Sequence, residues 1–249
     1  VVTRDVAYGP APRNTADIFI PLERGARKAV VVFIYGGGFA GGSKHTPGSP
    51  FYDNIGRWAA AHDLVGVTAN YRLAPQSKWP SGVEDITALV TWLKGHIAEY
   101  GGDPQRIFLW GHSSGGAHVA DYLAHAALTH KDPRVKGAIL MSAAVYDLGH
   151  EPSVWKAYYG DDTSKYAQES SLPGLLKSRT PLLVTDAELD PPAFQAQADE
   201  LTQARKAAGH PVERLHVLGH SHLSEAYAIG TADDSVSGPV LKFIHEHGG

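Results

Sequence analysis

Continuous apolar segments alternate with amphipathic ones along most of the chain. Five runs rich in β-branched and other apolar residues are each long enough for one buried strand: 28–35, 64–70, 106–111, 137–142 and 181–187. Such runs are typical of parallel strands that are covered on both faces. Between them, residues 82–100 repeat apolar positions at helical spacing, and residues 192–209 begin with proline and end on glycine. The pattern therefore predicts strands that alternate with helices.

Shorter segments near both ends of the chain extend this pattern. The pattern predicts an antiparallel pair of strands at one sheet edge, formed by residues 3–9 and 15–21. Near the other end of the chain it predicts a last strand over residues 212–218 and a closing helix over residues 237–247. We therefore expect an α/β fold with a mostly parallel, eight-stranded sheet and helices on both faces.

The longest irregular stretch of the chain is about residues 145–180, between two expected strands. It carries four aromatic residues, namely Trp155, Tyr158, Tyr159 and Tyr166. It could form a small cap over a site or be a long connection with helical turns. No repeat, flexible linker or low-complexity tract divides the chain, so residues 1–249 are expected to form one domain.

Composition removes several classes of function. The formal net charge of the 249 residues is -4, and no basic cluster interleaves with aromatic residues, so a nucleic-acid partner is not expected. No apolar run approaches the length that crosses a membrane. The chain has no cysteine, which excludes disulfides, a thiol nucleophile and thiolate metal sites. The compartment and the oligomeric state are not indicated.

One motif follows an expected strand in a way that suggests a nucleophile. The residues Gly111-His112-Ser113-Ser114-Gly115 come directly after an apolar run and open a small-residue helix. A Gly-x-Ser-x-Gly motif between a strand and a helix is typical of a serine held on a strained turn. The alternative is a serine that only caps the helix. The context favours Ser113 as a nucleophile.

A serine hydroxyl needs a base, and the base needs a carboxylate to orient it. Three acidic residues follow the strand at 181–187, and two histidines follow the last strand: Asp186, Glu188, Asp190, His220 and His222. Loop position favours Asp190, since Asp186 is closer to the strand and Glu188 can line the same loop. His222 is favoured as the base because it sits deeper in its loop. The two histidines lack a third metal ligand at a recognisable spacing, so no metal or other cofactor is expected.

Three glycines follow the first central strand, at residues 36–38. Without side chains, this loop can turn two backbone N–H groups into a cavity and stabilise an oxyanion. The N–H of Ser114, at the start of a helix, supplies a third donor. A phosphate-binding loop is the alternative, but neither glycine pattern of such loops is present.

These motifs together resemble the α/β-hydrolase superfamily of esterases and lipases. Seven segments carry the resemblance, in family order: "DIFIP", "IYGGGFAGGSK", "NYRLAP", "GVEDITALVTWL", "GGDPQRIFLWGHSSGGAHVA", "ELDPP" and "GHSH". The chain is similar to small carboxylesterases of the hormone-sensitive-lipase, feruloyl esterase and arylformamidase-like groups. The resemblance implies Ser113, Asp190 and His222 as the catalytic triad and the amides of Gly37, Gly38 and Ser114 as the oxyanion hole.

The sequence departs from the lipase-like group in two places. Tyr35 stands where that group usually has a histidine before the three glycines. About thirty residues precede this loop, too few for the helical cap of many lipase-like esterases, so we expect a shallow, open acyl pocket.

Three hypotheses for function follow. The first is a serine carboxylesterase that acts on short-chain or aryl esters of small molecules through an acyl-enzyme. The second is an arylformamidase, which would cleave an N-formylkynurenine-type amide with the same residues. The third is a hydrolase fold that has lost catalysis and serves as a binding module.

Overall fold

The computed structural model describes residues 1–23, 25, 27–129, 135–150 and 155–249. All the strands described belong to one eight-stranded sheet. Its strands, in their order across the sheet, are β1 (Val2–Ala7), β2 (Thr15–Phe19), β4 (Val65–Ala69), β3 (Lys28–Ile34), β5 (Gly102–His112), β6 (Gly137–Met141), β7 (Leu182–Ala187) and β8 (Val212–Val217). Strand β2 is antiparallel to both of its neighbours, β1 and β4. All neighbouring strands from β4 to β8 are parallel to each other. The expected α/β fold is confirmed.

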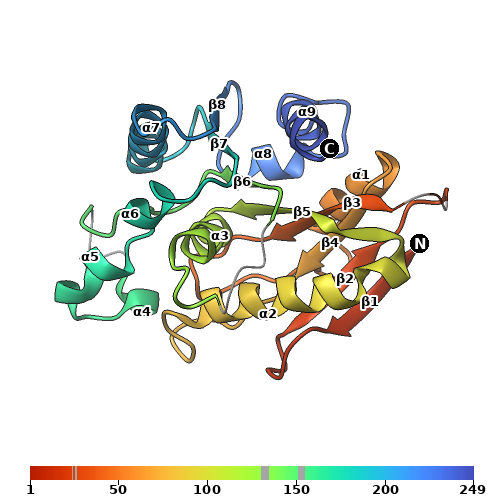
Figure 1. Ribbon diagram of the computed structural model, residues 1–249, viewed down its shortest axis with the longest axis horizontal. Helices are drawn as coiled ribbons and strands as arrows, with labels where there is room; N and C mark the ends of the chain where they lie inside the picture. The colour runs from red at the N-terminus through yellow and green to blue at the C-terminus, as the bar shows by residue number, and fades with distance from the viewer. Residues whose placement is uncertain (24, 26, 130–134, 151–154) are drawn as a thin grey trace.

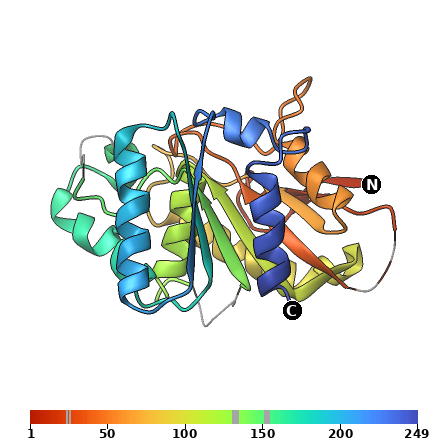
Figure 2. The same ribbon diagram turned by 90° about the horizontal axis from the view of Figure 1, so that it is seen from above.

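Helices cover both faces of this sheet. The longer ones are α1 (Asp53–Ala61), α2 (Ser81–His96), α3 (Ser114–Ala124), α7 (Pro192–Ala207) and α9 (Ser237–His247). Figure 1 shows α2, α3 and α7 on one face, with α1 and α9 on the other. Seen from above, α7 and α9 stand on either side of β7 and β8 (Figure 2). Within the described ranges, no helix is long and apolar enough to span a bilayer.

The apolar runs become strands because their side chains are buried on both sides. From Val30 to Ile34, no residue of β3 is more than 1% exposed. Burial of each such side chain contributes about 1.5–3 kcal/mol. In a parallel sheet, the carboxyl ends of the strands share one edge, and the loops that follow β3, β5, β6, β7 and β8 therefore gather there.

The two largest differences from the predicted boundaries are each about four residues long. The strand expected to begin at Arg106 begins at Gly102, because Gly102 already pairs with Lys28 of β3. The helix expected over 82–100 ends at His96 and continues as a 3₁₀ helix, Ile97–Tyr100.

Helix α1 has no counterpart among the predicted elements. Its sequence contains Gly56, which weakens a helical pattern. The glycine is needed because the helix lies against β2: a Cβ on Gly56 would lie 2.2 Å from the ring of Phe19.

The insertion at 145–180 contains short helices, and its residues 151–154 lie outside the described residues. These elements are α4 (Lys156–Tyr159), a 3₁₀ turn (Thr163–Lys165), α5 (Tyr166–Glu169) and α6 (Leu172–Leu175). They project at one end of the molecule (Figures 1 and 2). Tyr158 stacks on Phe39 at 4.7 Å, so the insertion packs onto the loop that follows β3. One domain over residues 1–249 remains our prediction, and the insertion can still be either a small cap or a long connection with helical turns.

Candidate active site

Ser113 lies in the tight turn between β5 and α3. Its φ of 54° and ψ of -125° are unusual for a residue with a side chain, and such backbone strain costs about 1–3 kcal/mol. The turn brings strand and helix very close together. A Cβ on Gly111 would lie 2.4 Å from the carbonyl oxygen of Gly115, and a Cβ on Gly115 would lie 2.1 Å from that of Ile34. The two glycines of the motif are therefore required by packing.

Asp190 and His222 are joined by a hydrogen bond of 2.7 Å between Oδ1 and Nδ1. The other carboxylate oxygen of Asp190 accepts hydrogen bonds from the Ser142 hydroxyl and the Ala187 amide. Burial alone raises the pKa of Asp190, but the hydrogen bonds that it accepts, that from His222 foremost, outweigh burial and hold this pKa below its usual value. Asp190 is therefore ionised at neutral pH, and the Nδ1–H of His222 donates to it.

The two other acidic residues of this loop have different partners. Asp186 forms an ion pair with Arg214 and a hydrogen bond of 2.8 Å with Nδ1 of His216. Glu188 accepts a hydrogen bond of 2.7 Å from the amide of Gly219, in the loop that carries the histidines. Neither carboxylate is bonded to His222 within the described residues.

His220 is held inside its own loop. Its Nδ1 lies 3.1 Å from the hydroxyl of Ser224, and its Nε2 lies 3.0 Å from Asp233. Its carbonyl oxygen accepts the Leu189 amide at 3.0 Å, which ties this loop to the one that carries Asp190. His220 therefore orders the loop, whereas His222 is bonded to the carboxylate.

Ser113 and His222 are linked through His112, the residue that precedes the serine. The Nε2–H of His112 donates to the backbone carbonyl of His222 at 2.8 Å, and the two rings lie 4.7 Å apart. No hydrogen bond joins the Ser113 hydroxyl to the His222 ring in the part of the chain that the structure describes. Such bonds are often long before a substrate binds and shorten in the complex.

The glycine loop lies against the serine. A Cβ on Gly36 would lie only 2.7 Å from Cβ of Ser113. Gly37 and Gly38 have φ values of 149° and 59°, and the Gly37 carbonyl accepts the amides two and three residues beyond Gly38. The N–H groups of Gly37, Gly38 and Ser114 donate to no acceptor among the described residues. They are free to bind an oxyanion.

We expect Gly37→Ala to lower kcat by about 100- to 1,000-fold, the usual effect of losing one oxyanion donor. A Cβ on Gly37 would lie 2.2 Å from the carbonyl oxygen of Gly41, so the loop must shift. The matched control is Gly48→Ala, at an exposed glycine with φ of 77° and no atom within 4 Å of the added Cβ. Steady-state kinetics on p-nitrophenyl acetate compares them. Equal activity of the two variants would contradict this role of the loop.

Tyr35, which stands where lipase-like esterases usually have a histidine, anchors the start of the glycine loop through contacts with Tyr71 and Arg13. Its buried ring stacks on Tyr71 at 4.7 Å, and the Tyr71 hydroxyl donates to the Tyr35 carbonyl at 3.0 Å. Arg13 donates to the Tyr35 hydroxyl at 2.7 Å and to the carbonyl of Gly42 at 3.0 Å. Tyr35 and Arg13 together therefore hold both ends of the loop.

Ser142, which donates to Asp190, was not predicted from the sequence. It directly follows β6 and has a strained φ of 43°. The available signal was its place at the carboxyl end of a strand, beside the strands that precede Ser113 and Asp190.

Among the residues that the structure describes, two groups of side chains could each hold a metal ion by distance alone. One is His112, His222 and Glu225, and the other is Asp147, His150 and Glu200, each with ligand atoms within 4.8 Å of one another. In the first group, His112 and His222 already make the hydrogen bonds described above. The second group is partly exposed and remote from Ser113 in the sequence.

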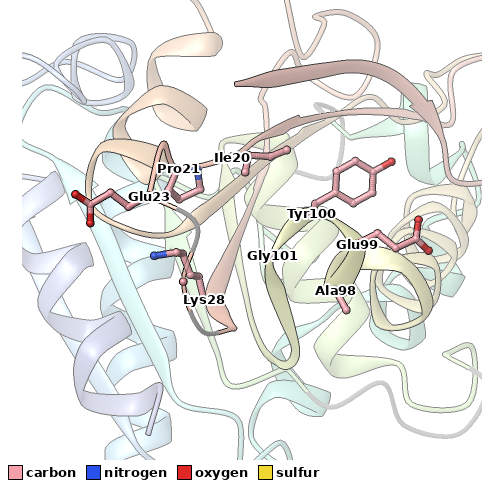
Figure 3. Close-up of a pocket in the computed structure, with 9 residues that line it drawn as sticks. Ile20, Pro21, Glu23, Lys28, Ala98, Glu99, Tyr100 and Gly101 are labelled. Atoms are coloured by element: carbon pink, nitrogen blue, oxygen red, sulfur yellow. The ribbon is translucent and has the colours of Figure 1, made fainter.

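A pocket of about 240 Å³ lies at the other end of the strands (Figure 3). Lys28 at the start of β3 and Gly101 just before β5 line it, together with Glu99 and Tyr100. Because it sits at the amino ends of parallel strands, it is remote from the loops that carry Ser113 and His222.

Known proteins resemble this chain in sequence and in fold. The family model BD-FAE matches residues 16–147. Esterase LipQ of Mycobacterium tuberculosis is 28% identical over 267 residues, which cover 97% of this chain and 62% of LipQ. A probable isoprenylcysteine alpha-carbonyl methylesterase of Arabidopsis thaliana, ICMEL1, is 36% identical over 119 residues, 48% of this chain and 24% of that protein. This chain thus spans less than two thirds of either relative.

Among solved structures, esterase B from Lactobacillus rhamnosis superposes with a TM-score of 0.84 at 18% identity, covering 100% of this chain and 86% of that one. A thermostable esterase from Pseudomonas putida superposes with a TM-score of 0.78 at 20% identity, covering 100% and 83%. The class that the fold defines is therefore the α/β-hydrolase fold, and the curated relatives of this chain are named as esterases. Within this class, the chain belongs to the BD-FAE family.

Proposed function

We propose that this chain is a serine carboxylesterase that hydrolyses short-chain or aryl esters. The observation that carries the proposal is the 2.7 Å bond between Asp190 and His222. Beside this pair lie a serine on a strained turn and a glycine loop whose amides donate to no acceptor among the described residues. The esterase names of its relatives support ester hydrolysis.

In the first half of the proposed reaction, Ser113 attacks the ester carbonyl. His222 takes the hydroxyl proton on Nε2 while its Nδ1–H stays bonded to Asp190, whose charge stabilises the imidazolium. The carbonyl oxygen becomes an oxyanion, which the free N–H groups of Gly37, Gly38 and Ser114 bind. The imidazolium then gives its proton to the departing alcohol, and the acyl group remains on Ser113.

In the second half, water replaces the alcohol. His222 takes a proton from the water, the resulting hydroxide attacks the acyl carbonyl, and the same amides bind the second oxyanion. Collapse of this intermediate releases the acid and returns the proton to Ser113. The cycle uses only side chains and amides of this chain.

An aromatic side chain beside the base supports short or aryl substrates. Phe194, near the start of α7, is half-buried and has its ring centre 5.4 Å from that of His222, at an interplanar angle of 69°. Trp155 of the insertion lies 6.5 Å from Phe194. Flat rings of this kind contact aromatic or short acyl groups well.

The test is kcat/KM for the wild type and Ser113→Ala on p-nitrophenyl esters from acetate to laurate and on N-formylkynurenine. We expect Ser113-dependent turnover that is highest for the short esters. A tenfold preference for the formamide, about 1.4 kcal/mol in transition-state binding, would replace the esterase with an arylformamidase. No turnover and no covalent labelling by an organophosphate would indicate a binding module.

A further inference from the structure

Phe39, the residue that follows the three glycines, has an unusual backbone conformation. Its φ is 64°, a left-handed value that a bulky residue rarely adopts, and it lies directly after Gly38, whose amide is one of the proposed oxyanion donors. Such a conformation is costly and persists only where the surrounding contacts enforce it. The contacts that hold Phe39 therefore also fix the end of the glycine loop.

Four aromatic rings contact the side chain of Phe39, which is 3% exposed. Tyr158 stacks on it, with the ring centres 4.7 Å and the ring planes 2° apart. Three more rings meet it edge-on, with centres at 5.2, 5.6 and 6.2 Å: His118, Tyr159 and Trp155. The backbone is held as well, since the Phe39 carbonyl accepts the Ala74 amide at 2.9 Å. Three of the four rings belong to the insertion at 145–180, so this segment packs directly against the residue that ends the glycine loop.

Tyr158, the insertion residue that stacks on Phe39, is itself fixed at two points. Its hydroxyl accepts the amide of Gly82 at 2.8 Å, and its backbone carbonyl accepts the amide of Trp79 at 2.9 Å. Gly82 is the second residue of α2, where helix amides have no partner within the helix. Phe39 and the three rings of the insertion form part of a small hydrophobic cluster that is separate from the main core of the sheet. The position of Phe39 therefore depends on the insertion and not on the sheet core alone.

His118 connects these rings to the helix that begins at Ser114. It lies on α3, is 0% exposed, and neither of its ring nitrogens has a hydrogen-bond partner among the described residues. Burial lowers the pKa of His118 to about 3, so the ring is neutral at neutral pH and packs as an aromatic group. It meets Tyr158 edge-on at 5.0 Å and Tyr71 edge-on at 4.6 Å, and the Tyr71 hydroxyl donates to the carbonyl of Tyr35 at the start of the glycine loop. One group of rings therefore contacts both ends of the glycine loop and the helix α3.

Given the catalytic assignments proposed above, on which this inference rests, we propose that Phe39 is a positioning residue of the oxyanion hole and that Tyr158 of the insertion holds it in place. Phe39 acts through the backbone: its packed ring keeps residue 39 in the left-handed conformation, and this conformation orients the N–H groups of Gly37 and Gly38. An oxyanion hole is effective because its donors are oriented before the reaction begins. Removing a ring from this contact should therefore weaken binding of the transition state, while binding of the substrate changes little.

The test compares substitutions that remove a ring from this contact with a matched substitution elsewhere. Phe39→Leu and Tyr158→Leu each remove the stacking and keep an apolar side chain, whereas Tyr158→Phe keeps the ring and removes only the hydroxyl. Phe243→Leu on α9 is the control, because Phe243 is also buried and meets the ring of Phe108 edge-on at 6.2 Å. Helix α9 lies on the opposite face of the sheet from α2 and α3 (Figure 1). Ser113→Ala in the same assays checks the catalytic assignment independently.

We expect Phe39→Leu and Tyr158→Leu to lower kcat on p-nitrophenyl acetate about tenfold with KM within about twofold, which is part of the roughly 100- to 1,000-fold that outright loss of one donor causes. Tyr158→Phe should keep most of the activity, and Phe243→Leu should lower the melting temperature without lowering kcat. Melting temperatures show which variants are folded. Where a leucine variant does not fold, Phe39→Met or Tyr158→Met takes its place, since the flexible methionine side chain fills irregular space. A raised KM with unchanged kcat would show that Phe39 contacts the substrate instead, and would overturn the proposal.

A double-mutant cycle with Gly37→Ala shows whether Phe39 acts through the glycine loop. Residues that act through one structural unit have non-additive effects on free energy, whereas the effects of independent residues add. Because Gly37→Ala already displaces the loop, adding Phe39→Leu to it should lower kcat further by less than about threefold. Two losses that multiply in full would show that Phe39 acts elsewhere, and would overturn the proposal.

A mimic of the tetrahedral intermediate gives a readout that a merely structural role would not change. A trifluoromethyl ketone adds the serine hydroxyl to its carbonyl carbon, the hydroxyl proton passes to His222, and the carbonyl oxygen becomes an oxyanion in the hole. Its inhibition constant should rise about tenfold in Phe39→Leu and Tyr158→Leu, in step with the loss of kcat, and stay unchanged in Phe243→Leu. Unchanged inhibition in the first two variants, or an equal loss in Phe243→Leu, would overturn the positioning role. An active Ser113→Ala would overturn the triad instead.

Discussion

Ser113→Ala should lower kcat on p-nitrophenyl acetate by about a millionfold, the usual loss when the nucleophile of such a triad is removed. The reason is its position, which no other hydroxyl of the described residues shares: Ser113 lies on the strained turn, against the glycine loop and next to His112, which contacts His222. Kinetics at saturating substrate measures the change, and mass spectrometry after organophosphate treatment shows whether the label is lost with the serine.

The neighbouring serine provides the control for this experiment. Ser114→Ala keeps its amide, which is the group expected to bind the oxyanion, and removes only the buried hydroxyl. It should keep most of the activity and the covalent label. Retained activity in Ser113→Ala, or a label on another residue, would show that the nucleophile has been misassigned.

Asp190→Asn is expected to lower kcat by about ten-thousandfold, as the corresponding change does in serine hydrolases whose histidine then takes the wrong tautomer. In this chain the carboxylate accepts the Nδ1–H of His222, whereas an amide can present an N–H to that nitrogen and leave the proton on Nε2. The base could then no longer accept the serine proton. KM should change much less than kcat.

Asp186→Asn is the matched control, at a buried aspartate four residues earlier. Its partners are Arg214 and His216, so the substitution removes an ion pair on the sheet and leaves the His222 bond unchanged. It should lower the melting temperature with little effect on kcat. If Asp186→Asn abolished activity and Asp190→Asn did not, the acid of the triad would be Asp186.

The strands and the motif residues could be predicted because their signals are local. Runs buried on both faces are apolar at every position, and the serine motif combines steric requirements within five residues. Even so, the start of β5 was predicted about four residues too late: Gly102 belongs to β5 because it has a partner on β3, and nothing in the neighbouring polar residues indicates this. Helix α1 was missed because its glycine packs against a strand far earlier in the chain.

The residues behind the proposed acid and base could not be found in the same way. Ser142 is 48 residues from Asp190, and His112 is 110 residues from His222, yet each pair is hydrogen-bonded. In the sequence alone, neither Ser142 nor His112 stands out from other serines and histidines. Only the folded sheet, which brings the ends of β5, β6 and β7 together, gives them a role.

The ties between the loops after β7 and β8 have a mechanical consequence. The Leu189 amide donates to the carbonyl of His220, and the Gly219 amide donates to the carboxylate of Glu188. Asp190 and His222 therefore lie on two loops that are joined by hydrogen bonds and form one rigid unit. The sheet end that bears Ser113 is the second unit. To form the site, only these two parts of the molecule have to be positioned relative to each other, and not three independent side chains. The conformational entropy of aligning His222 with Asp190 is lost once, as the chain folds, and not again at every turnover.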